Sequence, residues 1–404
     1  APAGAPNILV IMTDDVGFCA SSTFGGPIPT TAFDALAREG LRYNAFNTTA
    51  ICSPTRASLL TGRYPHNVAM GNATNVPTGY DGYTSVIPKS AATVARVLRD
   101  NGYGTAMFGK GHITPEWESG PAGPFDRWPT GLGFQHFYGF LNADTSMYEP
   151  ALVDDTRFVD PPAGDPTYHF DKDIADKAVA WIREQKSVAP ARPLFVYYAT
   201  GSAHAPHHAP PEWLARFRGR FDQGWDKLRE ETFARQKAMG IIPADAELIP
   251  RPAQLPAWDS LSPEQKRLGA RLMEAYAAAL SYADDQIGRV IAAMRATGKP
   301  EDTMIVYIQG DNGSSAEGGI NGLLFEQSQI NASDERLAYQ LSRIDEIGGK
   351  TLYNTYPAGW GWAMNTPFQW YKRVSSHFGG VRNGLVISWP GHVSDGNVVR
   401  GQFH

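Results

Sequence analysis

Short apolar runs that end in polar residues recur along the whole chain. They cover residues 7–12, 104–108, 194–199, 303–308 and 384–388. Runs this short are typical of strands that are buried on both faces, because most helices need a longer pattern. We therefore expect these runs to be inner strands of one sheet.

Segments with apolar residues at helical spacing separate these runs. They span residues 31–39, 53–61, 91–100, 171–184 and 262–297. Buried strands that alternate with helices are typical of α/β proteins. The pattern predicts an α/β fold in which helices flank both faces of a mixed, mostly parallel central sheet.

Two segments interrupt this alternation. Residues 115–166 are dense in glycine, proline and aromatic residues. We expect ordered loops with short strands there, because the aromatic side chains need burial. Residues 212–260 are charged and broken by prolines, which predicts a surface insertion of helices and loops. We expect residues 1–404 as a whole to form a single domain.

Composition and charge limit the partners of the chain. Of its 404 residues, 42% are hydrophobic and 19% are charged, against about 25% charged in an average protein. The net charge of −5 provides no basic excess to hold a phosphate backbone, so we expect no nucleic-acid partner. No run approaches the roughly 18 apolar residues of a membrane helix, which predicts no membrane span.

Acidic and amide side chains follow two of the apolar runs. Asp14 and Asp15 come after the first run, and Asp311 and Asn312 come after the fourth. Taken alone, such pairs are most often turns or helix caps. The carboxyl ends of parallel strands meet at one edge, however, and ligands bind there. Three carboxylates and an amide oxygen suit Ca²⁺ or Mg²⁺, so we expect a hard-cation site.

Basic residues and histidines follow two other runs. Lys110 and His112 come after residues 104–108, and His204 comes after residues 194–199 with His207 nearby. A single histidine is more often structural than functional. Zinc is the alternative metal, because His204 and His207 could join the acids, although the sequence has no HExxH or CxxC motif.

The sequence from Cys52 to Arg56, CSPTR, is the sharpest local signal. Ser53 and Pro54 favour a helix start, which places Cys52 where backbone N–H groups attract anions. Arg56 lies four residues further on and shares a helix face with Cys52. We expect the two side chains to line one anion pocket. Two alternatives are a buried cysteine with Arg56 in a surface salt bridge, and a thiolate nucleophile.

Together, these motifs resemble one enzyme family. The sequence CSPTRASLLTGR at residues 52–63 is similar to a signature of the type I sulfatases of the alkaline phosphatase superfamily, specifically the bacterial arylsulfatases. A second signature, Gly-Lys-Trp-His, appears at residues 109–112 with Gly111 in place of tryptophan. Further matches are Asp14-Asp15, Gly310-Asp311-Asn312-Gly313, His204, residues 366–372 and residues 379–382. The resemblance covers essentially the whole chain, and we expect the family's smaller C-terminal domain to be absent from it.

The resemblance implies a modified nucleophile. In this family a formylglycine-generating enzyme oxidises the motif cysteine, here Cys52, to formylglycine during maturation. The aldehyde hydrates to a geminal diol, one hydroxyl attacks sulfur, and the other expels sulfate and restores the aldehyde. A serine could accept the sulfate group but could not release it in this way.

The resemblance also implies roles for the other residues. The implied ligands of one Ca²⁺ or Mg²⁺ are Asp14, Asp15, Asp311 and Asn312. The residues implied to hold the sulfonate oxygens are Arg56, Lys110 and Lys372. His204 and Lys372 would protonate or stabilise the leaving oxygen, and His112 would orient the diol and assist its breakdown.

The implied function is hydrolysis of a sulfate monoester, a small molecule with an aryl or sugar leaving group. One alternative is a phosphonate or phosphate ester hydrolase with the same site, because these esters are near-isosteric with sulfate esters. Another is an inactive, Ca²⁺-dependent protein that binds sulfate groups or glycans. A thiol hydrolase using Cys52 with His112 or His204 is a third, and it leaves the three carboxylates unexplained.

The cellular compartment is only suggested by the sequence. The chain begins APAGAP without an initiator methionine, which suggests an exported, periplasmic or secreted protein. A cytoplasmic protein trimmed of a tag fits the same start. The two cysteines, Cys19 and Cys52, cannot form a disulfide framework, and we expect Cys19 to be a packing residue near the metal-binding loop.

Overall fold

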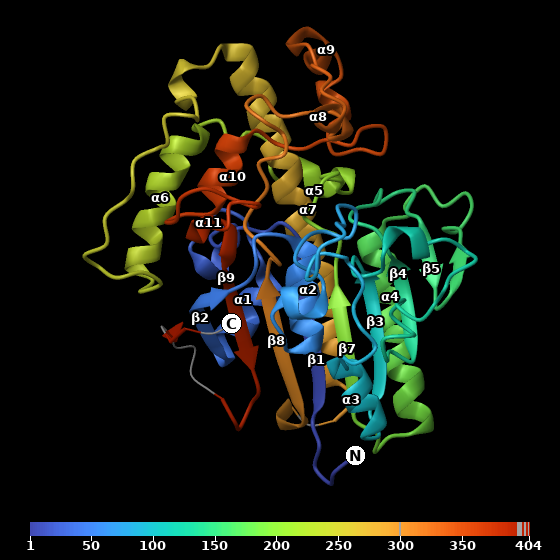
Figure 1. Cartoon of the computed structure of the whole chain (residues 1–404). Helices are drawn as coiled ribbons and strands as arrows, with labels where there is room; N and C mark the ends of the chain where they lie inside the picture. Colours follow the sequence, from blue (N-terminus) through green and yellow to red (C-terminus); the bar gives the residue numbers. More distant parts are fainter. Residues whose placement is uncertain (299, 394–397, 400, 403) are drawn as a thin grey trace.

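The computed structural model describes residues 1–298, 300–393, 398–399, 401–402 and 404. Within these residues, ten strands form one mixed sheet in the order β10-β2-β9-β8-β1-β7-β3-β4-β5-β6 (Figure 1). The strands are β1 (Asn7–Met12), β2 (Leu41–Asn47), β3 (Gly104–Lys110), β4 (His136–Phe140), β5 (Leu152–Asp154), β6 (Arg157–Val159), β7 (Leu194–Ala199), β8 (Thr303–Gln309), β9 (Arg382–Ser388) and β10 (Val398–Val399).

The middle of the sheet is parallel. Neighbouring strands in the run β8-β1-β7-β3-β4 pair in parallel. The predicted α/β fold with a mixed, largely parallel sheet is therefore confirmed. The predicted strand at 384–388 is present as β9, but it runs antiparallel to both β2 and β8.

Strand β2 was not among the predicted strands. Its sequence, LRYNAFN, mixes polar and apolar residues, and most of its residues are only half-buried. It lies between β9 and the two-residue strand β10, near one edge of the sheet. A strand in this position does not need an all-apolar run, so the pattern that marks the inner strands misses it.

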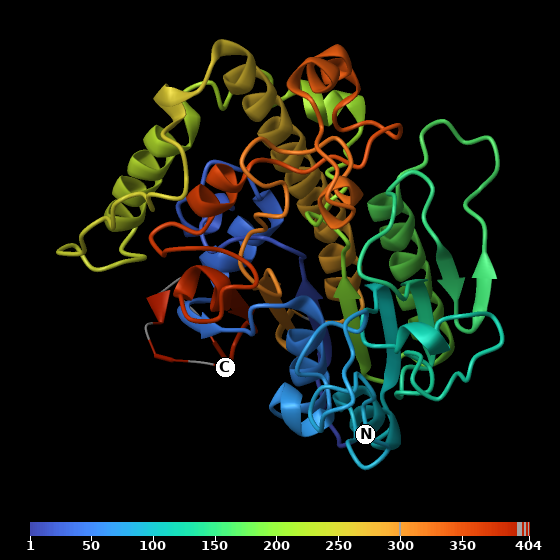
Figure 2. The same ribbon diagram turned by 45° about the horizontal axis from the view of Figure 1, so that its top comes forward.

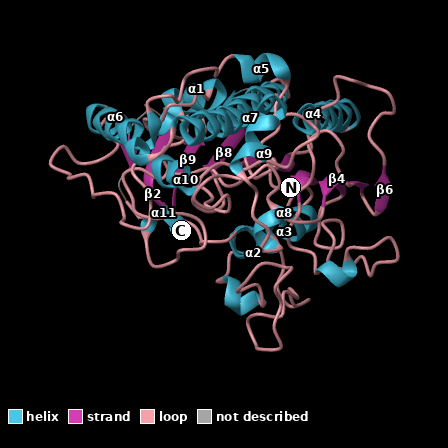
Figure 3. Cartoon of the chain, turned by 90° about the horizontal axis from the view of Figure 1, so that it is seen from above, coloured by secondary structure: helices cyan, strands magenta, loops and turns pink. Residues whose placement is uncertain are grey.

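Helices cover both faces of the sheet (Figure 3). They are α1 (Thr31–Glu39), α2 (Cys52–Thr61), α3 (Val94–Asp100), α4 (Phe170–Val188), α5 (Pro211–Ala215), α6 (Gly224–Ala238), α7 (Pro263–Arg295), α8 (Gln327–Ile330), α9 (Leu337–Ser342), α10 (Ala358–Met364) and α11 (Phe378–Val381). Helices α1, α4 and α7 pack on one face, where Phe33 and Ile287 share a core with Leu9 of β1. Helices α2 and α3 pack on the other face, where Leu60 shares a core with Met107 of β3. No described helix is long and apolar enough to cross a membrane.

Capping residues set the helix boundaries. The helix predicted at 91–100 begins only at Val94, because the Thr93 hydroxyl accepts a hydrogen bond from the backbone N–H of Arg96. Helix α7 follows Ser262, whose side chain forms a reciprocal capping box with Gln265. These local hydrogen bonds refine the boundaries that apolar spacing alone predicts.

The predicted surface insertion at 212–260 is only partly exposed. It contains α5 and α6, and α6 (yellow-green) lies at the edge of the molecule in Figure 2. The inner face of α6 is buried, because Trp225 packs edge-on against Trp258 and Trp360 with ring centroids 4.7 and 5.6 Å away. The surface prediction is therefore wrong for this face, where aromatic packing outweighs the charged and proline-broken pattern.

The carboxyl ends of the parallel strands meet at one end of the molecule. This end is uppermost in Figure 1, where the short helices α8, α9 and α10 also lie. Strands β1 and β8 are direct neighbours in the sheet. Polar residues that follow these two strands are consequently brought together.

Candidate active site

The predicted cation ligands form one buried cluster. Oxygen atoms of Asp14, Asp15 and Asp311 lie within 4.8 Å of one another, and all three side chains are buried. The Asn312 amide donates a hydrogen bond of 2.7 Å to Oδ1 of Asp15. Oδ1 of Asp14 and Oδ1 of Asn312 are buried without a hydrogen-bond partner. Orphaned oxygens beside crowded carboxylates fit a divalent cation that takes oxygen ligands.

Arg56 packs against this cluster from helix α2. Its guanidinium is fully buried, and Nε and Nη2 lie 2.9 and 2.8 Å from Oδ2 of Asp311. Nη2 is also 3.8 Å from Oδ1 of Asp14. The alternative in which Arg56 forms a surface salt bridge is therefore wrong. Because its helix begins at Cys52, Arg56 brings a fixed positive charge close to the candidate nucleophile.

Lys110 supplies a second buried cation. It is the last residue of β3, and its ammonium donates a hydrogen bond to Oδ2 of Asp14. Burial by itself lowers the pKa of Lys110, but the Asp14 carboxylate together with Cys52 and Asp311 outweighs burial, and the pKa is raised. Lys110 therefore stays protonated and can face an anion.

Cys52 lies at the first turn of α2 and contacts His112. The distance from its Sγ to Nδ1 of His112 is 3.0 Å, and both side chains are buried. Burial raises the pKa of the Cys52 thiol to about 11, although Lys110 lowers it. Burial, followed by the charge of Lys110, holds the pKa of His112 well below its usual value. A neutral thiol beside a neutral imidazole is a poor nucleophile, which argues against the thiol-hydrolase alternative.

Lys372 and His204 contact each other beside Asp15. Lys372 comes from the loop between α10 and α11, and its Nζ lies 2.9 Å from Oδ2 of Asp15 and 3.1 Å from Nε2 of His204. His204 follows β7, and its Nδ1 lies 2.8 Å from the carbonyl oxygen of Ala205. Burial lowers the pKa of Lys372, but Asp15 and then Glu317 outweigh it and the pKa lies well above its usual value.

Comparison with known proteins identifies the family. The model of the Sulfatase family matches residues 6–402. This chain belongs to the sulfatase family. It is 30% identical to an arylsulfatase of Klebsiella aerogenes over 404 aligned residues, which cover 97% of this chain and 82% of the relative. The predicted class of enzyme, a sulfatase that hydrolyses sulfuric esters, is therefore confirmed.

Solved structures share the fold of this chain. The structure of Ps i-CgsB in complex with k-i-k-neocarrahexaose has a TM-score of 0.62 and 22% identity, over 98% of this chain and 68% of that one. The phosphonate monoester hydrolase of Agrobacterium radiobacter has a TM-score of 0.53 and 18% identity, over 98% of this chain and 71% of that one. At these identities the likeness shows the fold alone.

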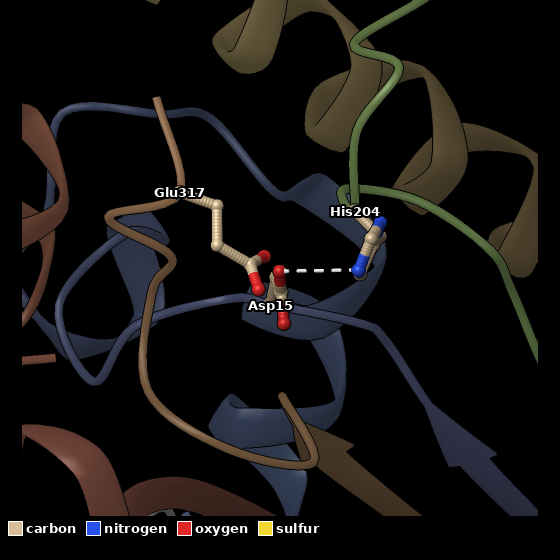
Figure 4. Close-up of side chains that lie close together, drawn as sticks. All are labelled: Asp15, His204 and Glu317. Atoms are coloured by element: carbon tan, nitrogen blue, oxygen red, sulfur yellow. Dashed lines mark ion pairs between the residues drawn. The ribbon is translucent and has the colours of Figure 1, made fainter. Parts of the chain in front are cut away.

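One residue of this sulfatase site was not predicted from the sequence. Glu317 lies in the loop after β8, and its Oε2 is 3.0 Å from Nζ of Lys372 (Figure 4 shows its approach to Asp15). Burial raises the pKa of Glu317, but Lys372 outweighs it and the pKa lies far below its usual range. The available signal was an acid six residues after Asp311 in the same strand-end loop.

Two other residues lie outside the cluster: His207, which was weighed as a zinc ligand, and Cys19, which was expected to be a packing residue near the metal-binding loop. The ring of His207 packs against Tyr276 and Tyr356, with centroids 5.1 and 4.9 Å away. Within the part of the chain that the structure describes, His207 belongs to no group of three metal-ligating side chains, which removes one support for zinc. Cys19 is buried, and its thiol donates to the carbonyl oxygen of Met364 at 3.1 Å.

Proposed function

We propose that this sulfatase cleaves sulfate monoesters through a formylglycine made from Cys52. The observation that carries the proposal is one buried cluster beside the start of α2. In it, three carboxylates lie close together, and the side chains of Arg56 and Lys110 form ion pairs with two of them. Without a metal ion, the carboxylates neutralise the charges of Arg56 and Lys110. A bound divalent cation would neutralise the carboxylates instead and leave both side chains free to bind an anionic ligand. When present, formylglycine supplies the oxygen nucleophile that attacks sulfur.

The proposed cation is Ca²⁺, with Mg²⁺ as the alternative. Its ligands would be the oxygens of Asp14, Asp15, Asp311 and Asn312. The two orphaned Oδ1 atoms support this donor set, because oxygen ligands suit either hard cation. When bound, the cation supplies positive charge that polarises the sulfonate oxygens.

Arg56 and Lys110 are proposed to hold the sulfonate group. Both side chains are fully buried, and both contact carboxylates of the candidate cation site. Fixed donors in a site without water stabilise charge that develops on oxygen in the transition state, and they need no reorganisation. His112, whose Nδ1 faces Cys52, is placed to orient the nucleophile.

His204 and Lys372 are proposed to serve the leaving oxygen. They come from different loops than Cys52, and both contact Oδ2 of Asp15. Both carry N–H groups suited to protonating or stabilising an alkoxide. An aryl or sugar sulfate is the proposed substrate class, because either alcohol leaves as an oxygen anion at this position.

Paired substrates test the reaction class. We expect nitrophenyl sulfate to be hydrolysed with a kcat/KM at least about tenfold above that of a nitrophenyl phosphonate, because a sulfate ester offers three free oxygens to the cationic groups of the site, whereas a phosphonate monoester of the same charge offers two. Faster hydrolysis of the phosphonate would overturn the sulfatase assignment in favour of the phosphonate alternative. Hydrolysis of neither ester by a preparation modified at Cys52 would favour the inactive binding protein.

The role of His204 predicts a dependence on the leaving group. General acid help is worth about 10²–10⁴-fold, and a poor leaving group needs it most. We expect His204→Ala to reduce kcat about 10²-fold for alkyl-like leaving groups but only a few-fold for nitrophenolate. Arg56→Lys is the comparison and should affect all esters about equally. Rates across aryl sulfates of rising phenol pKa measure this, and a slope unchanged by His204→Ala would contradict the acid role.

A further inference from the structure

A carboxylate outside the predicted set contacts Lys372. Nζ of Lys372 lies 3.0 Å from Oε2 of Glu317, 2.9 Å from Oδ2 of Asp15 and 3.1 Å from Nε2 of His204. Glu317 and His204 approach Asp15 from opposite sides (Figure 4). By donor type these three side chains also match a metal site. The Lys372 ammonium contacts all three side chains. It therefore supplies, at this place, the positive charge that a metal ion would otherwise supply.

Glu317 differs from the other two neighbours of Lys372. Asp15 is also a candidate cation ligand, and its Oδ1 accepts a hydrogen bond from Asn312. His204 contributes a ring nitrogen and no carboxylate. Glu317 is therefore the carboxylate contact of Lys372 that does not belong to the candidate cation site.

Glu317 is itself held in place. The Ser315 hydroxyl lies 3.0 Å from its Oε2 and 3.1 Å from its backbone nitrogen. The backbone N–H of Lys372 donates to the carbonyl oxygen of Ser314 at 3.0 Å, which ties the two loops together. The exposed Arg373 adds an ion pair of 3.6 Å to Oε1. Backbone and side-chain contacts thus both hold Glu317 next to Lys372. They leave the Lys372 ammonium little freedom to move away from the Glu317 carboxylate.

We propose that Glu317 is a positioning residue that holds the Lys372 ammonium against Nε2 of His204, on the side of the ester oxygen. This inference rests on the proposed roles of Lys372 and His204. Without the charge of Glu317, Asp15 is the carboxylate left to Lys372 among the described residues. Its attraction alone draws the ammonium toward the candidate cation site and out of the position in which it contacts Glu317, Asp15 and His204 together. Arg56 and Lys110, which are proposed to bind the sulfonate group, keep their contacts with Asp311 and Asp14.

Glu317→Gln tests this inference, because glutamine keeps the shape and one acceptor oxygen but removes the charge. We expect kcat to fall about tenfold for aryl sulfates with poor leaving groups and about twofold for nitrophenyl sulfate. KM should change little, because sulfonate binding is untouched. The plot of log kcat against phenol pKa should therefore steepen, and a parental slope overturns the proposal. If the glutamine variant does not fold, Glu317→Asp, which keeps the charge on a shorter side chain, should give an intermediate slope; a parental slope in that folded variant overturns the proposal equally.

A double-mutant cycle separates positioning from a general structural role. If Glu317 acts through Lys372, adding Glu317→Gln to Lys372→Ala causes no further loss of kcat. Losses that multiply would show that Glu317 acts independently of Lys372, and they overturn the proposal. A harmless Lys372→Ala would instead overturn the proposed catalytic role of Lys372, and this inference with it. The two failures are distinguishable, because only the second leaves the single lysine variant fully active.

Glu326 offers a matched control. Its side chain is 7% exposed, and burial, with a contribution from Glu317, raises its pKa to about 7 although His204 lowers it. Among the described residues it forms no ion pair with Lys372, whose carboxylate partners are Asp15 and Glu317. Assayed at about pH 8.5, where the Glu326 carboxyl is ionised, Glu326→Gln should therefore keep the parental slope. An equal steepening in this variant would mean that loss of any nearby negative charge is enough, which overturns the specific role of Glu317.

Discussion

Cys52→Ala is expected to lower kcat for aryl sulfates by at least about 10⁴-fold, the scale on which removal of a covalent nucleophile acts. The Cys52 side chain is buried at the first turn of α2, with Sγ 3.0 Å from His112. Bulk water therefore does not replace it as the nucleophile. Cys52→Ser should also be inactive in turnover, but it should gain one sulfonate group when incubated with substrate. Serine offers a hydroxyl to accept the group and no second hydroxyl to release it. Steady-state rates and intact mass of both variants measure this.

The second cysteine is the matched control for this prediction. Cys19 is also fully buried, but its thiol contacts backbone oxygens of Ala363 and Met364 and no predicted catalytic residue. Burial raises the pKa of Cys19 to about 12, so it stays a thiol. Cys19→Ser should keep most of the activity and the modification at position 52. Full activity in Cys52→Ala, or its loss in a folded Cys19→Ser, would contradict the assignment of the nucleophile.

Asp311→Ala is expected to remove bound metal and activity together, with kcat reduced by at least about 10³-fold. Oδ2 of Asp311 contacts the Arg56 guanidinium at 2.8 and 2.9 Å, and Oδ1 lies 3.4 Å from the backbone nitrogen of Asp15. The side chain thus links the candidate cation site to the sulfonate-binding arginine. Metal content measured by mass spectrometry after dialysis, together with kcat, tests the prediction.

A second variant separates loss of metal binding from loss of stability. Removing Asp311 leaves the buried guanidinium of Arg56 without its main partner, which lowers stability. Asp311→Asn keeps the shape and one ligand oxygen but removes a negative charge, so it should bind the metal more weakly while it melts close to the parent. Asp284→Asn is the control, because that buried carboxylate accepts hydrogen bonds from Ala32 and Phe33 at the start of α1. A metal affinity equal to that of the parent in folded Asp311→Asn would refute the ligand assignment.

The inner strands were predictable because burial on both faces leaves a continuous apolar run. The sequence LFVYYA became β7, and its residues are all buried. The direction of β9 was not predictable, because a buried strand has the same apolar sequence pattern whether it runs parallel or antiparallel to its neighbours. The buried inner face of α6 was hidden for a related reason: Trp225 is buried by Trp258 and Trp360, which are distant in sequence.

The candidate site was predictable where side chains stand at the ends of strands. Asp14 and Asp311 meet because β1 and β8 are parallel neighbours, and the family resemblance supplied the residues that lie in loops, such as Lys372. Glu317 was missed because its position depends on the path of a loop. The pairing of Arg56 with Asp311 was not predicted either, because spacing placed the arginine only on a helix face.

The chemical species at position 52 tests the central claim most directly. Mass spectrometry of the peptide that contains Cys52, from an active preparation, should show formylglycine, about 18 Da lighter than cysteine because one oxygen replaces a sulfur and two hydrogens. Across preparations with different degrees of modification, kcat should rise in proportion to the modified fraction. An unmodified thiol in a preparation that hydrolyses aryl sulfates at full rate would contradict the account.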